Sequence, residues 1–194
     1  AGTLWLGNAL EVAEVMRVLT GAAEGPILEV AAELGGGLLA SGGLAADAQA
    51  GAEAILAAVR DGRALERFAR MSAGMGAPVG FADDWQRFLP EAPVICAVKA
   101  PRDGVVSAID GAALGMAVVG LGGGRVVEAD QIDPAVGLSE VVRLGARVRQ
   151  GEPLAMVHAA RSEAADAAVE AVLAAIRLSD APVAEPELIL ERIG

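Results

Sequence analysis

A glycine cluster closed by an arginine is the first feature of this sequence that could bind a ligand. The stretch AVVGLGGGRVVEAD, residues 117–130, holds Gly120, Gly122, Gly123 and Gly124, followed by Arg125. Glycine-rich loops bind phosphate when G-x-G-x-x-G follows a strand and opens a helix, because backbone amides and the positive helix end then meet the anion. Here Arg125 stands where the third glycine belongs, and the residues after it are a poor helix. The cluster is therefore an incomplete dinucleotide-binding motif.

The residues before the cluster predict a helix instead. Asp110 is suited to the N-cap, and apolar residues then recur at helical spacing at Ala113, Leu114, Ala117, Val118 and Leu121. The glycines follow the C-terminal end of this helix, whose negative dipole repels phosphate and favours a cation such as Arg125. We expect a helix cap and a turn; the alternative makes residues 116–119 a strand and the glycines a loop over an anionic ligand.

The residue types that most often carry catalysis are scarce. The chain has one cysteine, Cys96, and one histidine, His158, each within a strand-like apolar run. This argues against a histidine-ligated metal cluster and against a Cys/His catalytic pair. We expect Cys96 to be a buried small hydrophobe and His158 to be a hydrogen-bonded structural residue. Two carboxylate pairs could suggest acid–base chemistry, but they fall in loop-like stretches where we expect them to be solvated: Asp83 with Asp84, and Glu185 with Glu187.

A second glycine pattern is typical of a carrier-type hairpin. Gly145, Val148, Gly151 and Leu154 form G-x-x-V-x-x-G-x-x-L, a spacing found where short strands turn tightly in lipoyl- or biotinyl-type barrel sandwiches. A carrier needs a lysine on the following hairpin, and this sequence offers Arg161 there. Arginine cannot form the amide link, so the pattern indicates the fold without the carrier chemistry.

Composition and charge limit the partners. The 194 residues are 54% hydrophobic, with a formal net charge of −11. This acidity opposes nonspecific binding to nucleic acid or to anionic membranes, because phosphates would be repelled. No apolar run reaches the length of about 18 to 20 residues that a membrane span needs, and the N-terminus lacks the basic region of a signal peptide. We expect a cytoplasmic protein.

The elements that must position these residues change character near residue 90. We expect an α+β fold, with helices and no strand in residues 1–90 and a strand-rich module in residues 91–194. Asn8 is the expected N-cap of the first helix, with Glu11 completing a capping box and Gly21 at the C′ position. The next three helices are expected over 26–41, 44–60 and from Leu65 through Met71. Strands are expected over 94–100, 104–110, 138–144, 153–159 and 187–193, with one helix over 163–178 after Ser162.

Five segments in this order resemble the thymidine phosphorylases and the related pyrimidine-nucleoside phosphorylases. They are GNALEVAEVMRVLTG, DGRALERFARM, ALGMAVVGLGGGR, IDPAVGL and GEPLAMVHA. The resemblance covers nearly the whole chain from Gly7, and the third segment is highly specific. It implies the C-terminal part of such an enzyme, a little under half of it.

The resemblance implies an architecture and an activity for the intact enzyme. The family's enzymes are cytoplasmic homodimers in which a helical domain and an α/β domain flank a cleft. They are pentosyltransferases of pyrimidine salvage, which convert thymidine or another pyrimidine nucleoside and phosphate reversibly into the base and a (deoxy)ribose 1-phosphate, without a cofactor. Residues 1–90 would be the helical remainder of the α/β domain, and residues 91–194 an α/β-hammerhead or barrel-sandwich module. Dimerisation would use helices that precede this chain.

The resemblance places few site residues in this chain. The family's phosphate loop and base-contacting residues lie upstream, so we expect no catalytic residue here and no turnover by the chain alone. Arg125 is a candidate for contact with substrate at cleft closure. Some members hold a monovalent cation, and the matching ligands would be Glu14 with the carbonyls of Gly2 and Trp5, since oxygen ligands suit a hard cation; otherwise Glu14 is a solvated helix residue. The second hypothesis is a non-catalytic interaction module of lipoyl or biotinyl type.

Overall fold

The computed structural model describes residues 3–184 and 187–191, which form two compact units. The helical unit comprises Ala13–Phe88 with residues 187–191, and the strand unit comprises Thr3–Val12 with residues 89–184. The chain is a mixture of helices and strands, so the predicted α+β class is confirmed. None of the helices in the described ranges is long and apolar enough to cross a membrane.

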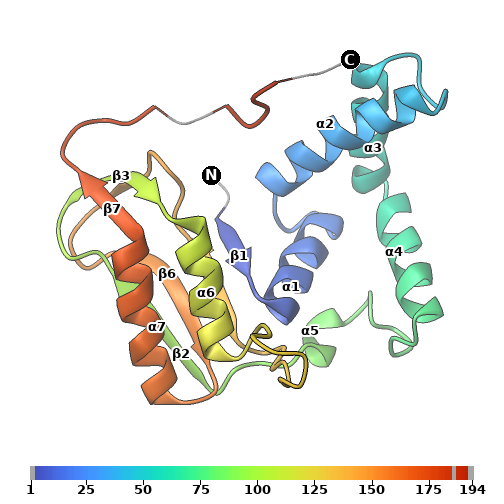
Figure 1. Cartoon of the computed structure of the whole chain (residues 1–194). Helices are drawn as coiled ribbons and strands as arrows, with labels where there is room; N and C mark the ends of the chain where they lie inside the picture. The colour runs from blue at the N-terminus through green and yellow to red at the C-terminus, as the bar shows by residue number, and fades with distance from the viewer. Residues whose placement is uncertain (1–2, 185–186, 192–194) are drawn as a thin grey trace. The chain divides into compact units, whose positions relative to one another are not determined.

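The helices of the first half follow the predicted pattern except for one shifted boundary and one short additional helix, Trp85–Phe88, which was not predicted. They are α1 (Asn8–Leu19), α2 (Pro26–Ser41), α3 (Ala48–Arg60), α4 (Arg63–Gly74) and the short α5 (Trp85–Phe88) (Figure 1). The prediction that the third helix starts at residue 44 is wrong. Asp47 is its N-cap, because the Asp47 carboxylate accepts a hydrogen bond of 2.8 Å from the Ala50 amide. Leu44 is therefore left exposed in the turn before the helix.

Glycines let α2 and α3 approach closely. A Cβ atom on Gly36 would collide with the backbone of Ala48 and Ala52, and one on Gly51 would lie 2.5 Å from the Gly36 carbonyl oxygen. The two helices therefore meet backbone to backbone at this point, where no side chain would fit.

Two antiparallel sheets form the strand unit. The larger sheet has the order β1-β4-β6-β2, from β1 (Leu4–Leu6), β4 (Gly137–Val141), β6 (Pro153–Ala159) and β2 (Val94–Lys99). The smaller sheet has the order β5-β3-β7, from β5 (Arg147–Val148), β3 (Gly104–Ile109) and β7 (Ile176–Ser179). The expectation of no strand before residue 90 is wrong, because β1 pairs with β4 through the partners Leu4 with Val141 and Leu6 with Leu138.

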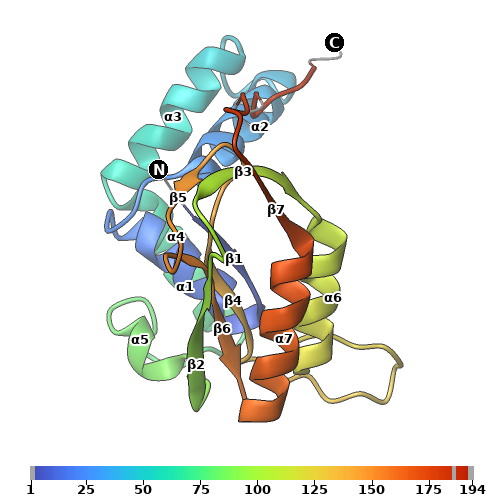
Figure 2. The same cartoon turned by 90° about the vertical axis from the view of Figure 1, so that its left-hand side faces the viewer.

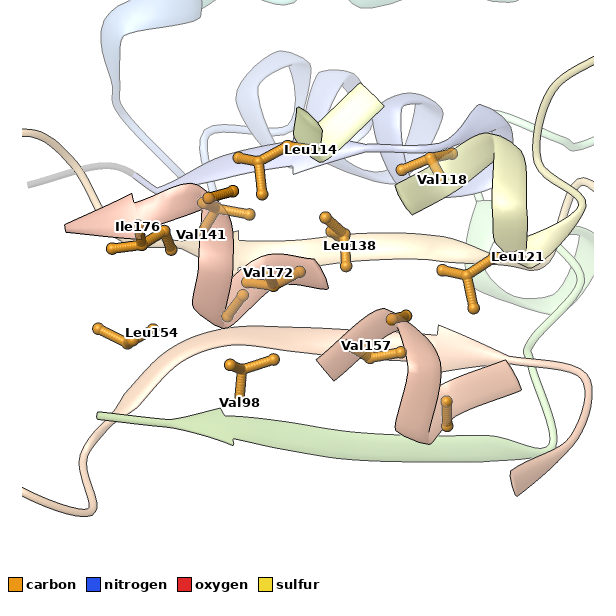
Figure 3. Close-up of a cluster of buried hydrophobic side chains, with 14 of the residues drawn as sticks. Val98, Leu114, Val118, Leu121, Leu138, Val141, Leu154, Val157, Val172 and Ile176 are labelled. Atoms are coloured by element: carbon orange, nitrogen blue, oxygen red, sulfur yellow. The ribbon is translucent and has the colours of Figure 1, made fainter. Parts of the chain in front are cut away.

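Two helices cover one face of the larger sheet. They are α6 (Gly111–Leu121) and α7 (Ser162–Ala175), which lie side by side (Figures 1 and 2). Apolar side chains from both helices meet those of the strands in a single core (Figure 3), and the fully buried members include Val98, Leu138, Val141, Val157 and Val172. This core fixes the position of the turn that follows α6.

Two predictions for the end of the chain are wrong. The helix expected over 163–178 ends at Ala175, and Ile176–Ser179 leave it to pair with β3 as strand β7. β-branched Ile176 suits this strand, and its partner Ile109 lies directly opposite. The strand expected over 187–193 is not formed in its described part, residues 187–191, and the remainder lies outside the described residues.

Candidate functional site

The glycine cluster forms the C-terminal cap of α6. At the other end of the helix, the Asp110 carboxylate accepts a 2.9 Å hydrogen bond from the Ala113 amide, as predicted for an N-cap. Gly122 has φ 97°, which favours glycine, and the amides of Gly122 and Gly123 donate to the carbonyls of Val119 and Val118. The alternative in which residues 116–119 form a strand is wrong. These two amides are already bonded within the cap, so they do not form a phosphate cradle.

Hydrogen bonds from two directions hold the turn after the cap. The Asn8 side-chain amide donates to the Gly123 carbonyl over 3.0 Å, and the Asp133 amide donates to the Gly122 carbonyl over 2.9 Å. Asn8 was predicted to be a helix N-cap; instead, the Glu11 carboxylate reaches back to the Gly7 amide over 3.2 Å. Asn8 is thereby available to fasten the turn.

A carboxylate shapes the loop that follows. Asp130 Oδ2 accepts from the amides of Val127 and Val126, over 3.0 and 2.9 Å, and these backbone hydrogen bonds lower the pKa of the Asp130 carboxyl. The exposed side chains of Arg125, Val126 and Val127 extend from this fixed loop. Among the described residues, the Arg125 guanidinium makes neither a hydrogen bond nor an ion pair. The loop therefore presents one free cation beside two exposed valines.

The proposed cation ligands fall in different parts of the chain. Trp5 lies in β1 of the strand unit, and Glu14 lies in the part of α1 that belongs to the helical unit. Gly2 lies outside the described residues. Within the described residues, no group of three or more His, Cys, Asp or Glu side chains could hold a metal ion.

His158 is hydrogen-bonded inside the larger sheet. Its Nε2 atom lies 2.7 Å from Oγ of Ser139, which is buried on the neighbouring strand β4. Burial lowers the pKa of His158 below its ordinary value of 6.5, and the negative charges of Glu140 and Glu91 partly oppose that shift. A half-buried imidazole held by a buried serine agrees with the predicted structural role.

The remaining candidates from the sequence do not converge on a site. Cys96 is half-buried and packs against the core of the strand unit. Asp83 and Asp84 are exposed, as expected. Glu187 is also exposed, and its predicted neighbour Glu185 lies outside the described residues. Arg161 is exposed at the position just before α7.

A polar pocket of about 630 Å³ in the strand unit was missed from the sequence. One lining residue, Asp180, is held by Arg102, whose guanidinium donates to the Asp180 carboxylate over 2.6 Å and to the Leu178 carbonyl over 2.6 Å. The Asp103 carboxylate accepts from the Gln150 amide over 2.7 Å. The pocket joins turns that lie far apart in the sequence, so no local motif marks it; its lining includes Asp103, Arg147, Arg149, Glu152 and Asp180.

Comparison with known proteins identifies relatives of this chain. Residues 105–179 match the pyrimidine nucleoside phosphorylase C-terminal domain. The chain is 45% identical to a thymidine phosphorylase of Burkholderia cenocepacia (strain HI2424) over 183 residues, which are 94% of this chain and 42% of that protein. Thymidine phosphorylases of Burkholderia orbicola, strains AU 1054 and MC0-3, show the same identity and coverage. The chain thus spans about two fifths of the length of these relatives.

Proposed function

We propose that this chain belongs to the pyrimidine nucleoside phosphorylase family and is the C-terminal portion of a thymidine phosphorylase. The observation that carries the proposal is the 45% identity to thymidine phosphorylases over 94% of the chain. In the intact enzyme, a phosphate oxygen attacks the anomeric carbon of thymidine while the bond to the base breaks and the base leaves with the electron pair. The products are thymine and 2-deoxyribose 1-phosphate, and the transfer is reversible.

The two halves of the chain have different roles in this proposal. Residues 1–90 supply the helical part of the α/β catalytic domain, and residues 91–194 are the C-terminal module, of the α/β-hammerhead or barrel-sandwich type. The turn between β5 and β6 supports this type, because the two strands flank Gly151 at φ 84° and belong to different sheets. The catalytic residues belong to other segments of the enzyme, so the chain by itself is inactive.

A chimeric enzyme tests the proposal. The 183 matched residues of the Burkholderia cenocepacia relative are replaced by the corresponding part of this chain. We expect phosphate-dependent release of thymine from thymidine by the chimera and none by the 194-residue chain alone. A folded chimera without this activity would count against the proposed function, and activity of the chain alone would contradict the division of roles.

Arg125 is proposed to meet bound substrate when the cleft closes. Its free guanidinium and the hydrogen bonds that fix its loop support this role, because the loop backbone then needs no further ordering when the cation binds an anion. In the chimera, we expect Arg125→Ala to lower kcat/KM at least about tenfold. Unchanged kcat/KM would remove Arg125 from the site.

A monovalent cation site is proposed at Glu14 with the carbonyls of Gly2 and Trp5. Its support is the chemistry of these oxygen ligands, which suit a hard cation. If the site binds potassium, the chimera should be activated by potassium, and Glu14→Gln should raise the potassium concentration needed for half-activation. An identical potassium response in both forms would contradict this site.

The cellular location, oligomeric state and partners are inferred from the family. We infer a cytoplasmic homodimer that uses pyrimidine nucleoside and phosphate without a cofactor, with its dimer contacts made by helices outside this chain. An acidic chain of net charge −11 suits this setting and makes nucleic acid and anionic membranes poor partners. The non-catalytic carrier-like module receives no support, because Arg161 stands where a carrier needs lysine and the relatives are phosphorylases.

A further inference from the structure

An exposed apolar stripe runs along α2 in the helical unit. Ile27, Ala31, Leu34 and Leu38 follow one another at intervals of four, three and four residues, so they share one side of the helix. All four are exposed, with 65% of Leu34 and 74% of Leu38 open to solvent. We name these four residues the α2 stripe. Large apolar side chains aligned in this way form a continuous patch, which marks an interaction site.

The other side of α2 is already packed. It faces α3 (Figure 1), and its buried residues Ala32 and Gly36 lie on that side. The only charged residues of the helix are Glu29 and Glu33. A helix with apolar residues on two sides is typical of a protein interior rather than of a surface. The sequence of α2 is therefore that of a helix with a second neighbour.

An apolar recess adjoins the stripe. It has a volume of about 300 Å³ and lies between α1, α2 and α3 within the helical unit. Ile27 and Ala31 belong both to the stripe and to the wall of the recess. The rest of the wall is also apolar and consists of Val15, Val18, Leu19, Leu28, Ile55 and Val59. The stripe and the recess thus form one surface, able to take a large apolar side chain beside a flat apolar contact.

We propose that the α2 stripe and this recess bind the part of the intact enzyme that lies outside this chain. That part presents an apolar segment along α2 and inserts one large apolar side chain into the recess. The inference rests on the proposed function, because the relatives are more than twice as long as their match to this chain, which covers 42% of their length. The remaining length supplies ample chain to cover a three-turn stripe.

A second copy of the chain is a poorer candidate for the partner that covers the α2 stripe. α2 has 16 residues, so it is about 24 Å long. Two such helices that cross at the usual angles touch over only a few turns. Their contact falls short of the roughly 1,200–2,000 Å² that a stable interface buries.

Thiol labelling of the chimera tests whether the α2 stripe is covered in the intact enzyme. In a Cys96→Ser background, which removes the natural cysteine of this chain, Leu34→Cys places a thiol within the stripe. Ala57→Cys is the matched control, because Ala57 is exposed on the face of α3 that carries Gln49 and Arg60. We expect the thiol at position 34 to react at least about 100-fold more slowly in the chimera than in the 194-residue chain, since labelling then requires local opening. The thiol at position 57 should react equally in both, as read by peptide mass spectrometry.

The outcomes separate this inference from the proposed function. An active chimera with a reactive thiol at position 34 would overturn the inference and leave the function standing. A protected thiol in a folded but inactive chimera would support binding at the α2 stripe and contradict the proposed function. If the chimera fails to fold, co-expression of this chain with the unmatched remainder of the relative decides. The two parts should co-purify, and this should be abolished by Leu34→Glu with Leu38→Glu but not by Ala57→Glu. That result supports binding at the α2 stripe. The absence of co-purification, or a dimer of this chain alone that the same pair of substitutions dissociates, overturns the inference.

Discussion

Two adjacent glycines of α2 provide the sharpest test of the packing. A Cβ on Gly36 would lie 2.6 Å from the Ala52 backbone nitrogen, whereas a Cβ on Gly37 meets no atom within 4 Å. Replacing a helical glycine by alanine stabilises the helix by about 0.5–1 kcal/mol. Forcing two packed backbones apart costs about 1–3 kcal/mol. We therefore expect Gly37→Ala to stabilise the helical unit by about 0.5–1 kcal/mol, and Gly36→Ala to destabilise it by about 0.5–2 kcal/mol.

Urea unfolding followed by far-UV circular dichroism measures both variants against the unmodified chain. Gly35→Ala is a useful intermediate, because its Cβ would meet only the movable end of the Ile55 side chain. Changes of the same sign and size for Gly36→Ala and Gly37→Ala would refute the reasoning, since they would show that α2 and α3 do not meet at Gly36.

Three further predictions concern the strand unit. Leu138→Ala should lower its free energy of unfolding by about 3 kcal/mol, because a fully buried side chain leaves a cavity; a loss under about 1 kcal/mol in urea unfolding would contradict the core described above. Asp110→Ala should cost about 1 kcal/mol in the same assay by removing the cap hydrogen bond to the Ala113 amide, and no change would argue against the cap. Burial lowers the pKa of His158 below 6.5 in the folded chain. Below pH 6.5 the unfolded chain thus binds more protons, and stability falls as the pH decreases toward the folded pKa. An NMR titration of the single imidazole should give a midpoint below 6.5, and a midpoint above this value would contradict the burial.

Local patterns were sufficient for most helices and for the central strands. Asp110 and the apolar spacing after it define α6, and Pro26 with Gly42 brackets α2, because caps and periodicity act within a few residues. The wrong predictions arise where contacts with distant segments determine the secondary structure. Leu4 pairs with Val141, far along the chain, so three residues that are uninformative on their own become a strand.

The candidate site was predictable in part for the same reason. The helix cap and the turn before Arg125 follow from the glycines and the helix that precedes them. The bond from Asn8 to the Gly123 carbonyl joins residues 115 positions apart, and no local signal announces it. Asn8 carried a second possibility as a cap residue, and only the tertiary structure selects between the two roles.

The pairing of β1 with β4 also constrains how the protein is made. On the ribosome, Leu4–Leu6 emerge long before Gly137–Val141, their partners in the sheet. At about 5–20 residues per second, β1 waits on the order of ten seconds with its apolar residues unpaired. During that interval, the β4 strand of a completed molecule whose own β1 has detached can pair with it. This pairing would exchange the segment between the two chains. A version of the strand unit cut at residue 90 would keep β4 as a permanent open edge, so a separately expressed form has to retain residues 3–12.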